Sequence, residues 1–364
     1  MSLADQADLI KYLNATRARQ NSFSFGTVRA ILNEKFGVPT AQGWDLLIQR
    51  YQAISPTHKD LQPALAGAKE AHKASILYGN RALTIFEVPH SVAGVMLRTC
   101  QKLVNPQSVF AASYPFPVDR STLERSSWNA EFVKFVRNTQ DNSVRLIACS
   151  KRAYRERKTI DVGSLTAAAS QALGSYDEVI GVTSGYVQAY DSVVIRPSGR
   201  IEIHIDMCCP MPLAESDIIQ FMKYYIDVLN TAFPPPPNQQ KHLYRPLNLF
   251  GLVQAFYDDN DGKVRNLGHA TGTNSVKQER MRSRKDDLRV EPFHRKGLAA
   301  IDSTDLYSIE KTWGGELSSV FPSVTLPGKF SMAGDIDARI DYAIVGNCSG
   351  KIDFDQTVAR LRET

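Results

Sequence analysis

Cysteine is scarce in this sequence, and the few cysteines follow no ligand or disulfide pattern. Five are present, an odd number, and no two of them form a C-x-x-C pair. A disulfide-stapled secreted domain or a zinc ribbon would show paired cysteines at short spacing. The sequence therefore favours a reducing, cytoplasmic environment, and 364 residues are enough to bury a core without cross-links.

Long hydrophobic runs are also absent. No apolar stretch approaches the roughly 18 residues that a membrane-spanning helix needs. The first residues, MSLADQADLIKYL, lack the basic-then-apolar layout of a secretory signal. We therefore expect no membrane partner.

Motifs that define a common reaction are missing as well. The sequence contains no G-x-x-x-x-G-K-[ST], no G-x-G-x-x-G, no G-x-S-x-G and no H-E-x-x-H. The formal net charge of +5 is mildly basic, which permits a nucleic-acid partner without requiring one. The sequence thus leaves open whether the protein is an enzyme, and it identifies no cofactor.

The composition, 43% hydrophobic and 22% charged, is that of a globular protein, and the length suggests two or three domains. The expected fold class is α+β. Its parts are a helical module (residues 1–79), a central α/β domain (residues 80–233), a proline-rich linker (residues 234–241) and an antiparallel β-rich C-terminal domain (residues 242–364). The run PPPPNQQ makes the linker extended and semi-rigid.

The N-terminal module shows helical periodicity throughout, with helices expected at residues 4–21, 25–36, 41–54 and 61–77. The short join FGVPT between the second and third helices loosely fits a helix-turn-helix. However, Gly43 stands where an apolar residue would pack, and the exposed side of the third helix carries little positive charge. The two interpretations are a DNA-reading helix-turn-helix and a bundle that docks a partner protein or a second copy of the chain.

The central region is expected to follow the ferredoxin-like β-α-β-β-α-β order from residue 143 onward. Its clearest unit is a hairpin of strands 179–195 and 200–207 followed by a helix at 215–233, because Ile201, Ile203 and Ile205 alternate strictly. The last strand of the order is expected at 247–257. The strands VRLIACS and RIEIHID carry no aromatic side chains, which argues against RNA bases stacking on this sheet.

Further elements are expected on either side of this unit. Upstream, the pattern indicates strands at residues 82–88 and 108–116 and a helix at 122–138. Downstream, it indicates strands at 264–271, 288–292, 306–311, 323–330 and 336–345 and a closing helix at 353–362. The glycine- and hydroxyl-rich segment 268–275 suits either a turn or a backbone cradle for an anion.

Strand 200–207 carries three side chains suited to chemistry. Period-two spacing places Glu202, His204 and Asp206 on one face, about 7 Å apart. Two carboxylates and an imidazole can hold a divalent metal ion or act as an acid–base pair. Asp191 across the hairpin lies within reach for some turn registers. The alternative is the solvated polar face of an antiparallel strand.

Two basic stretches are candidate phosphate contacts, since arginine forks match phosphate oxygens. The first, residues 151–158, contributes Arg152, Arg155 and Arg157, with Tyr154 available to stack on a base. The second, residues 275–296, contributes Lys277, Arg280, Arg282, Arg284, Lys285 and Arg289. The alternatives are a salt-bridged loop for the second stretch and a charged strand edge for the first.

We therefore expect a nucleic-acid-binding protein that contacts phosphates through these stretches, within a larger assembly. One alternative is a metal-dependent hydrolase, such as a nuclease, with Glu202, His204 and Asp206 as ligands; only this alternative requires a divalent metal cofactor. The other is a non-catalytic adaptor that docks a partner through residues 1–79. The sequence does not distinguish DNA from RNA.

Overall fold

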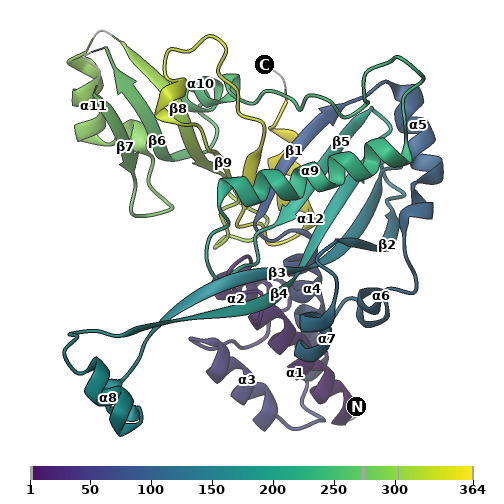
Figure 1. Ribbon diagram of the computed structural model, residues 1–364, viewed down its shortest axis with the longest axis vertical. Coiled ribbons are helices and arrows are strands. Elements are labelled where there is room, and N and C mark those ends of the chain that lie inside the picture. The colour runs from purple at the N-terminus through teal and green to yellow at the C-terminus, as the bar shows by residue number, and fades with distance from the viewer. Residues whose placement is uncertain (1–2, 273–274, 302, 363–364) are drawn as a thin grey trace.

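One ten-stranded antiparallel sheet organises the structure. The computed structural model describes residues 3–272, 275–301 and 303–362 (Figure 1). Within these residues it combines the sheet with twelve α-helices, which confirms the mixed α+β class. The strands lie in the order β2-β3-β4-β5-β1-β10-β9-β8-β6-β7.

The first half of the sheet comes from the central part of the chain. Its strands are β1 (Arg81–Glu87), β2 (Glu131–Arg137), β3 (Val144–Thr159), β4 (Ile180–Ile195) and β5 (Arg200–Asp206). The expected hairpin is formed by β4 and β5, with Ser192 opposite His204. Gly199 in its turn has φ +90°, and a Cβ there would lie 2.2 Å from the carbonyl oxygen of Val88. Only glycine fits this position, which helps to fix the register of the hairpin.

The second half of the sheet continues from β1. Strand β10 (Ala343–Gly346) pairs with β1, so that Val345 lies opposite Arg81. The remaining strands are β6 (Lys263–Thr271), β7 (Val276–Arg280), β8 (Thr304–Thr312) and β9 (Ser323–Leu326). Three of the expected C-terminal strands are thereby confirmed, and the one expected at 336–345 is a strand only from Ala343. Backbone hydrogen bonds thus join the residues on either side of the proline-rich segment into one sheet.

Helices cover both faces of the first half of the sheet. On one face, α5 (His90–Thr99) and α9 (Glu215–Ala232) pack over Ile201, Ile203 and Ile205, and Figure 1 shows α9 lying across these strands. On the other face lie α4 (Leu61–Leu77) and α12 (Lys351–Ala359), and Phe354 of α12 contacts the ring of His204. The polar side of β5 is therefore buried as well, in contrast to the half-solvated strand that the alternation suggested.

The N-terminal helices pack against this second face. They are α1 (Leu3–Arg17), α2 (Phe25–Ala30), α3 (Trp44–Ala53) and α4. A π-helical turn, Ile31–Lys35, extends α2, and residues 36–43 then connect it to α3. Leu9 and Leu13 of α1 belong to the same hydrophobic cluster as Leu83 and Ile85 of β1. Docking of a partner by this module, or a helix-turn-helix, stays a prediction.

Three expected elements have a different conformation. Residues 108–116 contain a helix, α6 (Val109–Ser113), and the helix expected at 122–138 is replaced by a short α7 (Arg120–Arg125) and strand β2. Residues 288–292 form a 3₁₀ turn (Leu288–Val290) that leads into α11 (Pro292–Ala299). Residues 108–116 are a short, mostly apolar run, in which periodicity does not separate a strand from one side of a buried helix.

The strand expected at 247–257 is also a helix, α10 (Gly251–Asp258), which buries Leu252, Val253 and Phe256. The expected ferredoxin-like order therefore lacks its last strand. Helix α8 (Ala167–Leu173) lies at the tip of the β3–β4 hairpin and buries none of its residues. The segment 268–275 runs along β6 as far as Thr271, and residues 273–274 lie outside the described part of the chain.

The β3–β4 hairpin extends beyond the body of the protein as an arm (Figure 1). Each strand has 16 residues, and the two pair along their whole length from Val144–Ile195 to Thr159–Ile180. The inner half is buried in the sheet, whereas the outer half is exposed on both faces. Among the described helices, none is long and apolar enough to cross a membrane.

Candidate functional site

The polar face of β5 holds a buried pair of hydrogen-bonded side chains, Glu202 and His204. Glu202 and His204 are both 0% exposed, and Nε2 of His204 lies 3.1 Å from Oε2 of Glu202. Arg196 and Arg200 each donate an Nε–H to Oε1 of Glu202, at 2.8 and 2.9 Å. Burial opposes ionisation of this carboxyl, but the hydrogen bonds from His204 and Arg196 hold the pKa of Glu202 below its usual value.

His204 is neutral at physiological pH. Burial lowers its pKa to about 4, against the attraction of Glu202. Its Nδ1 faces Nη1 of Arg145 at 3.4 Å. A ring that donates from Nε2 to Glu202 and accepts at Nδ1 from Arg145 satisfies both contacts, which assigns the tautomer.

The third predicted residue, Asp206, lies where β4 separates from β5 to enter the arm. Its Oδ2 accepts from the backbone N–H of Tyr190 at 2.9 Å and from Nη2 of Arg19 at 2.8 Å. In return, Oδ1 of Asp191 accepts from the backbone N–H of Asp206 at 2.7 Å. The two carboxylates thus replace ladder hydrogen bonds at the fork between the strands, which confirms that Asp191 is within reach of β5.

Three buried arginines, Arg19, Arg81 and Arg152, neutralise the two carboxylates at this fork. Arg152 forms a bidentate pair with Asp191, with both contacts at 2.6 Å, and Arg81 lies 3.6 Å from Oδ1 of Asp206. Burial opposes ionisation of Asp206, but the guanidinium groups around it hold its pKa below the usual value. Among the described residues, Glu202, His204 and Asp206 do not bring three ligand atoms within the span of one metal ion. The hydrolase alternative therefore has no assembled ligand set on this strand.

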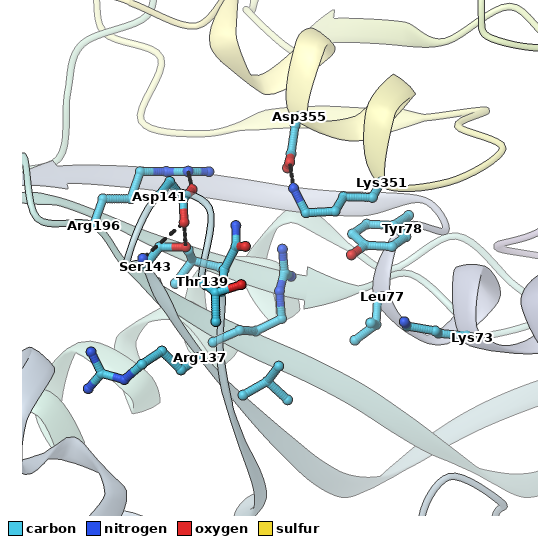
Figure 2. Close-up of a pocket in the computed structure, with 14 residues that line it drawn as sticks. Lys73, Leu77, Tyr78, Arg137, Thr139, Asp141, Ser143, Arg196, Lys351 and Asp355 are labelled. Carbon is cyan, nitrogen blue, oxygen red and sulfur yellow. Dashed lines mark hydrogen bonds and ion pairs between the residues drawn. The ribbon is translucent and has the colours of Figure 1, made fainter.

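A cavity of about 230 Å³ lies beside the buried pair, between the β2–β3 turn and helices α4 and α12 (Figure 2). Figure 2 shows Lys73 and Tyr78 entering it from one side, Lys351 and Asp355 from α12, and Asp141 from the turn. Five cationic side chains line it: Lys73, Arg137, Arg145, Arg196 and Lys351. The two lining carboxylates are already paired, Asp141 with Arg196 at 3.2 Å and Asp355 with Lys351 at 2.5 Å.

This cavity has the composition of a small anion site. Arg145 is half-buried, and its guanidinium lies 5.5 Å from the centre of the Tyr78 ring. Neither Arg145 nor Lys73 forms an ion pair with another described residue. Unpaired cations in a concave, partly desolvated position can hold a phosphate group through charge-assisted hydrogen bonds. Sequence reasoning missed this site because its residues come from four separate segments.

A second cleft, of about 530 Å³, lies at the base of the arm between β3 and α9. Trp128 at its rim is 59% exposed, and Nζ of Lys151 lies 4.5 Å from the centre of its ring. The ring of Tyr186 packs edge to face against the ring of Trp128, with 5.8 Å between the two ring centres. Exposed aromatic rings beside a lysine form a surface on which a base can stack. Trp128 falls within the helix expected at 122–138, which does not form.

The basic stretch on the arm divides into buried and exposed parts. Arg152 is 2% exposed and its guanidinium is occupied by Asp191, so this residue stabilises the fork. Arg155 and Arg157 are exposed and point to the same face of β3, opposite Ser184 and Val182 of β4. Neither forms an ion pair within the described residues. The ring of Tyr154 lies over Gly185 of the neighbouring strand. A Cβ at position 185 would come within 2.5 Å of this ring.

The second basic stretch follows the outer edge of the sheet. Strand β7 is the last strand, and Lys277, Arg280, Arg282, Arg284 and Lys285 are exposed along it and the loop that follows. These five cations have no ion-pair partner in residues 3–272, 275–301 and 303–362. Arg289 differs, since it pairs with Asp287 at 2.7 Å and donates to the carbonyl oxygens of Tyr257 and Gly262. Arg289 is thus a structural residue of the loop.

Like charges are held together at this edge. Arg265 of β6 donates to the carbonyl oxygens of Met281 and Ser283 and so supports the loop that carries Arg282 and Arg284. Burial and the nearby guanidinium groups of Arg280 and Arg284 lower the pKa of Arg265, against the attraction of Glu310. An anion bound here would relieve this repulsion.

No model of a known protein family matches the chain, and comparison with curated proteins found no match.

Proposed function

We propose that the protein binds nucleic acid through phosphate contacts at the β7 edge, defined as Lys277, Arg280, Arg282, Arg284 and Lys285. The observation that carries the proposal is that five exposed cations within nine residues lack carboxylate partners. The alternative of a salt-bridged loop would pair these charges, as Asp287 and Arg289 are paired.

A polyanion suits this edge better than a single small anion. The cations extend from β7 into the following loop, so that one phosphate group cannot reach all of them. Neutralising each phosphate of a nucleic acid releases condensed counterions, and this supplies most of the sequence-independent binding free energy. The repulsion around Arg265 adds a further contribution when the charges are neutralised.

The arm offers a second set of contacts. Arg155 and Arg157 supply unpaired charges, and Trp128 supplies a stacking surface at the arm base. In Figure 1 the arm and the β6–β7 strands extend to the same side of the body. Seven phosphate contacts, five at the β7 edge and two on the arm, correspond to a slope of about −6 for log K against log[salt] on duplex DNA.

The experiment is titration of the whole protein against a labelled random duplex and a labelled random single strand, at low and moderate salt. Binding that weakens steeply with salt supports the proposal. Tighter binding of the single strand would indicate that Trp128 and Tyr186 contribute by stacking. Absence of binding to either probe at low salt would refute the proposal and favour the adaptor alternative.

The same titration in the presence of magnesium or manganese tests the hydrolase alternative. Binding without cleavage is the expected outcome, because Glu202, His204 and Asp206 are enclosed and paired with arginine or with one another. Metal-dependent cleavage that is lost in Glu202→Gln would contradict this assignment.

A further inference from the structure

Two histidines and a glutamate meet in the C-terminal half of the sheet. Strand β6 contributes His269, β7 contributes Glu279, and α11 contributes His294. Oε1 of Glu279 lies 2.7 Å from Nε2 of His269 and 3.0 Å from Nδ1 of His294. One ligand atom from each residue lies within 4.8 Å of the other two, which is the span of donor atoms around a single metal ion.

The three side chains are held in place by the fold. His269 and His294 are each 2% exposed, and the side chain of Glu279 is 20% exposed. Glu291 caps α11 by accepting from the backbone N–H of His294 at 2.6 Å, which fixes the start of the helix. The cluster is therefore closed on the two imidazole sides and reachable by water on the carboxylate side.

The outer nitrogen of the His294 ring adds to the assignment. Nε2 of His294 lies 2.9 Å from the hydroxyl of Tyr257. Metal-binding histidines generally have such an outer partner, which orients the ring, and a tyrosine hydroxyl can either donate or accept. Nδ1 of His269 is buried without a hydrogen-bond partner, so among the described residues the contact of Nε2 with Glu279 is the hydrogen bond that orients this ring.

We propose that His269, Glu279 and His294 form a binding site for a divalent transition metal ion of the zinc class. Two imidazole nitrogens and one carboxylate oxygen are a donor set that suits Zn²⁺, and water on the exposed side completes a tetrahedral site. Binding requires the ligand atoms to move apart from their present hydrogen-bonded separations, because 2 Å metal–ligand bonds place tetrahedral donors slightly more than 3 Å from one another.

The bound ion would connect α11, and with it the loop of residues 281–291, to the β6–β7 hairpin. The site does not depend on nucleic-acid binding and would exist whether or not the β7 edge contacts phosphates.

The test is isothermal titration of the full-length, metal-free protein with Zn²⁺ alone, followed by thermal unfolding with and without the ion. Wild type is expected to bind one equivalent and to unfold at a higher temperature when loaded. Titration with Co²⁺ should give the intense visible absorption of a tetrahedral ion. Glu279→Gln and His294→Ala are expected to lose at least about 100-fold in affinity, and Tyr257→Phe about 10-fold through its effect on the His294 ring.

His58→Ala is the matched control, because it removes a histidine that lies between α3 and α4, far along the chain from the site. It should bind zinc like wild type. Folding of each variant is checked by circular dichroism, and the nearly isosteric Glu279→Gln stands in for His294→Ala if the latter does not fold. Absence of zinc binding by folded wild type would overturn the proposal, and so would undiminished binding by Glu279→Gln.

Discussion

Replacing Asp206 by asparagine should destabilise the protein strongly. Asp206 is 0% exposed and lies 2.8 Å from Arg19 and 3.6 Å from Arg81. At an effective dielectric constant of 20 these distances correspond to attractions of roughly 6 and 5 kcal/mol, which largely offset the cost of burying the charges. Asparagine keeps an oxygen for the Tyr190 N–H but leaves the arginines without their counter-charge. Loss of one member of a buried pair costs about 3–5 kcal/mol, and we expect Asp206→Asn to fall in this range.

The assay is urea denaturation followed by circular dichroism and tryptophan fluorescence, to check that both signals report one transition. Asp355→Asn is the control, because it removes a carboxylate from a partly exposed i,i+4 pair with Lys351. The expected loss there is about 0.5 kcal/mol or less. A loss below about 1 kcal/mol for Asp206→Asn would refute the view that the fork is an ion network that supports the fold.

Two further predictions concern acid stability and the arm. Burial lowers the pKa of His72 to about 4 from an ordinary value of 6.5, so the unfolded chain takes up a proton first and stability should fall as the pH drops from 6.5 towards 4. In His72→Gln the free energy of unfolding should fall less over this range than in wild type, by roughly 2 kcal/mol at pH 4.5. Urea denaturation at a series of pH values measures this difference. Parallel curves of unfolding free energy against pH for the two proteins would contradict the assignment. Limited chymotrypsin digestion should cut first near Tyr176, which is 63% exposed at the tip of the arm. The two fragments should co-elute in size-exclusion chromatography, since the inner halves of β3 and β4 stay within the sheet; a first cut elsewhere would count against the exposed arm.

Sequence patterns predicted the elements that depend on local periodicity. The alternation of Ile201, Ile203 and Ile205 identified β5, and helix α4 has the expected bounds. The prediction of a strand at 247–257 was wrong because an apolar run of this length suits either a strand or one face of a buried helix. The three apolar positions at Leu252, Val253 and Phe256 fit the helical alternative.

The environment of the candidate residues could not be predicted from local sequence. Burial of Glu202 and His204 depends on Phe354, which is about 150 residues away in the chain, and Asp206 is paired with Arg19, which precedes it by 187 residues. His269, Glu279 and His294 were not recognised as a cluster because separations of 10 and 15 residues match no ligand motif. Only the antiparallel pairing of β6 with β7 and the return of α11 bring them together.

The central claim is that the β7 edge contacts phosphates, and the salt slope of binding tests it most directly. Arg282 and Arg284 are exposed and unpaired, so the double variant Arg282→Ala with Arg284→Ala should keep its fold. Arg50→Ala with Arg98→Ala removes the same charge from exposed positions on α3 and α5. On duplex DNA the first variant should have a log K–log[salt] slope shallower than wild type by about 2, while the second keeps the wild-type slope. An unchanged slope in the first variant, or equal flattening in both, would contradict the account.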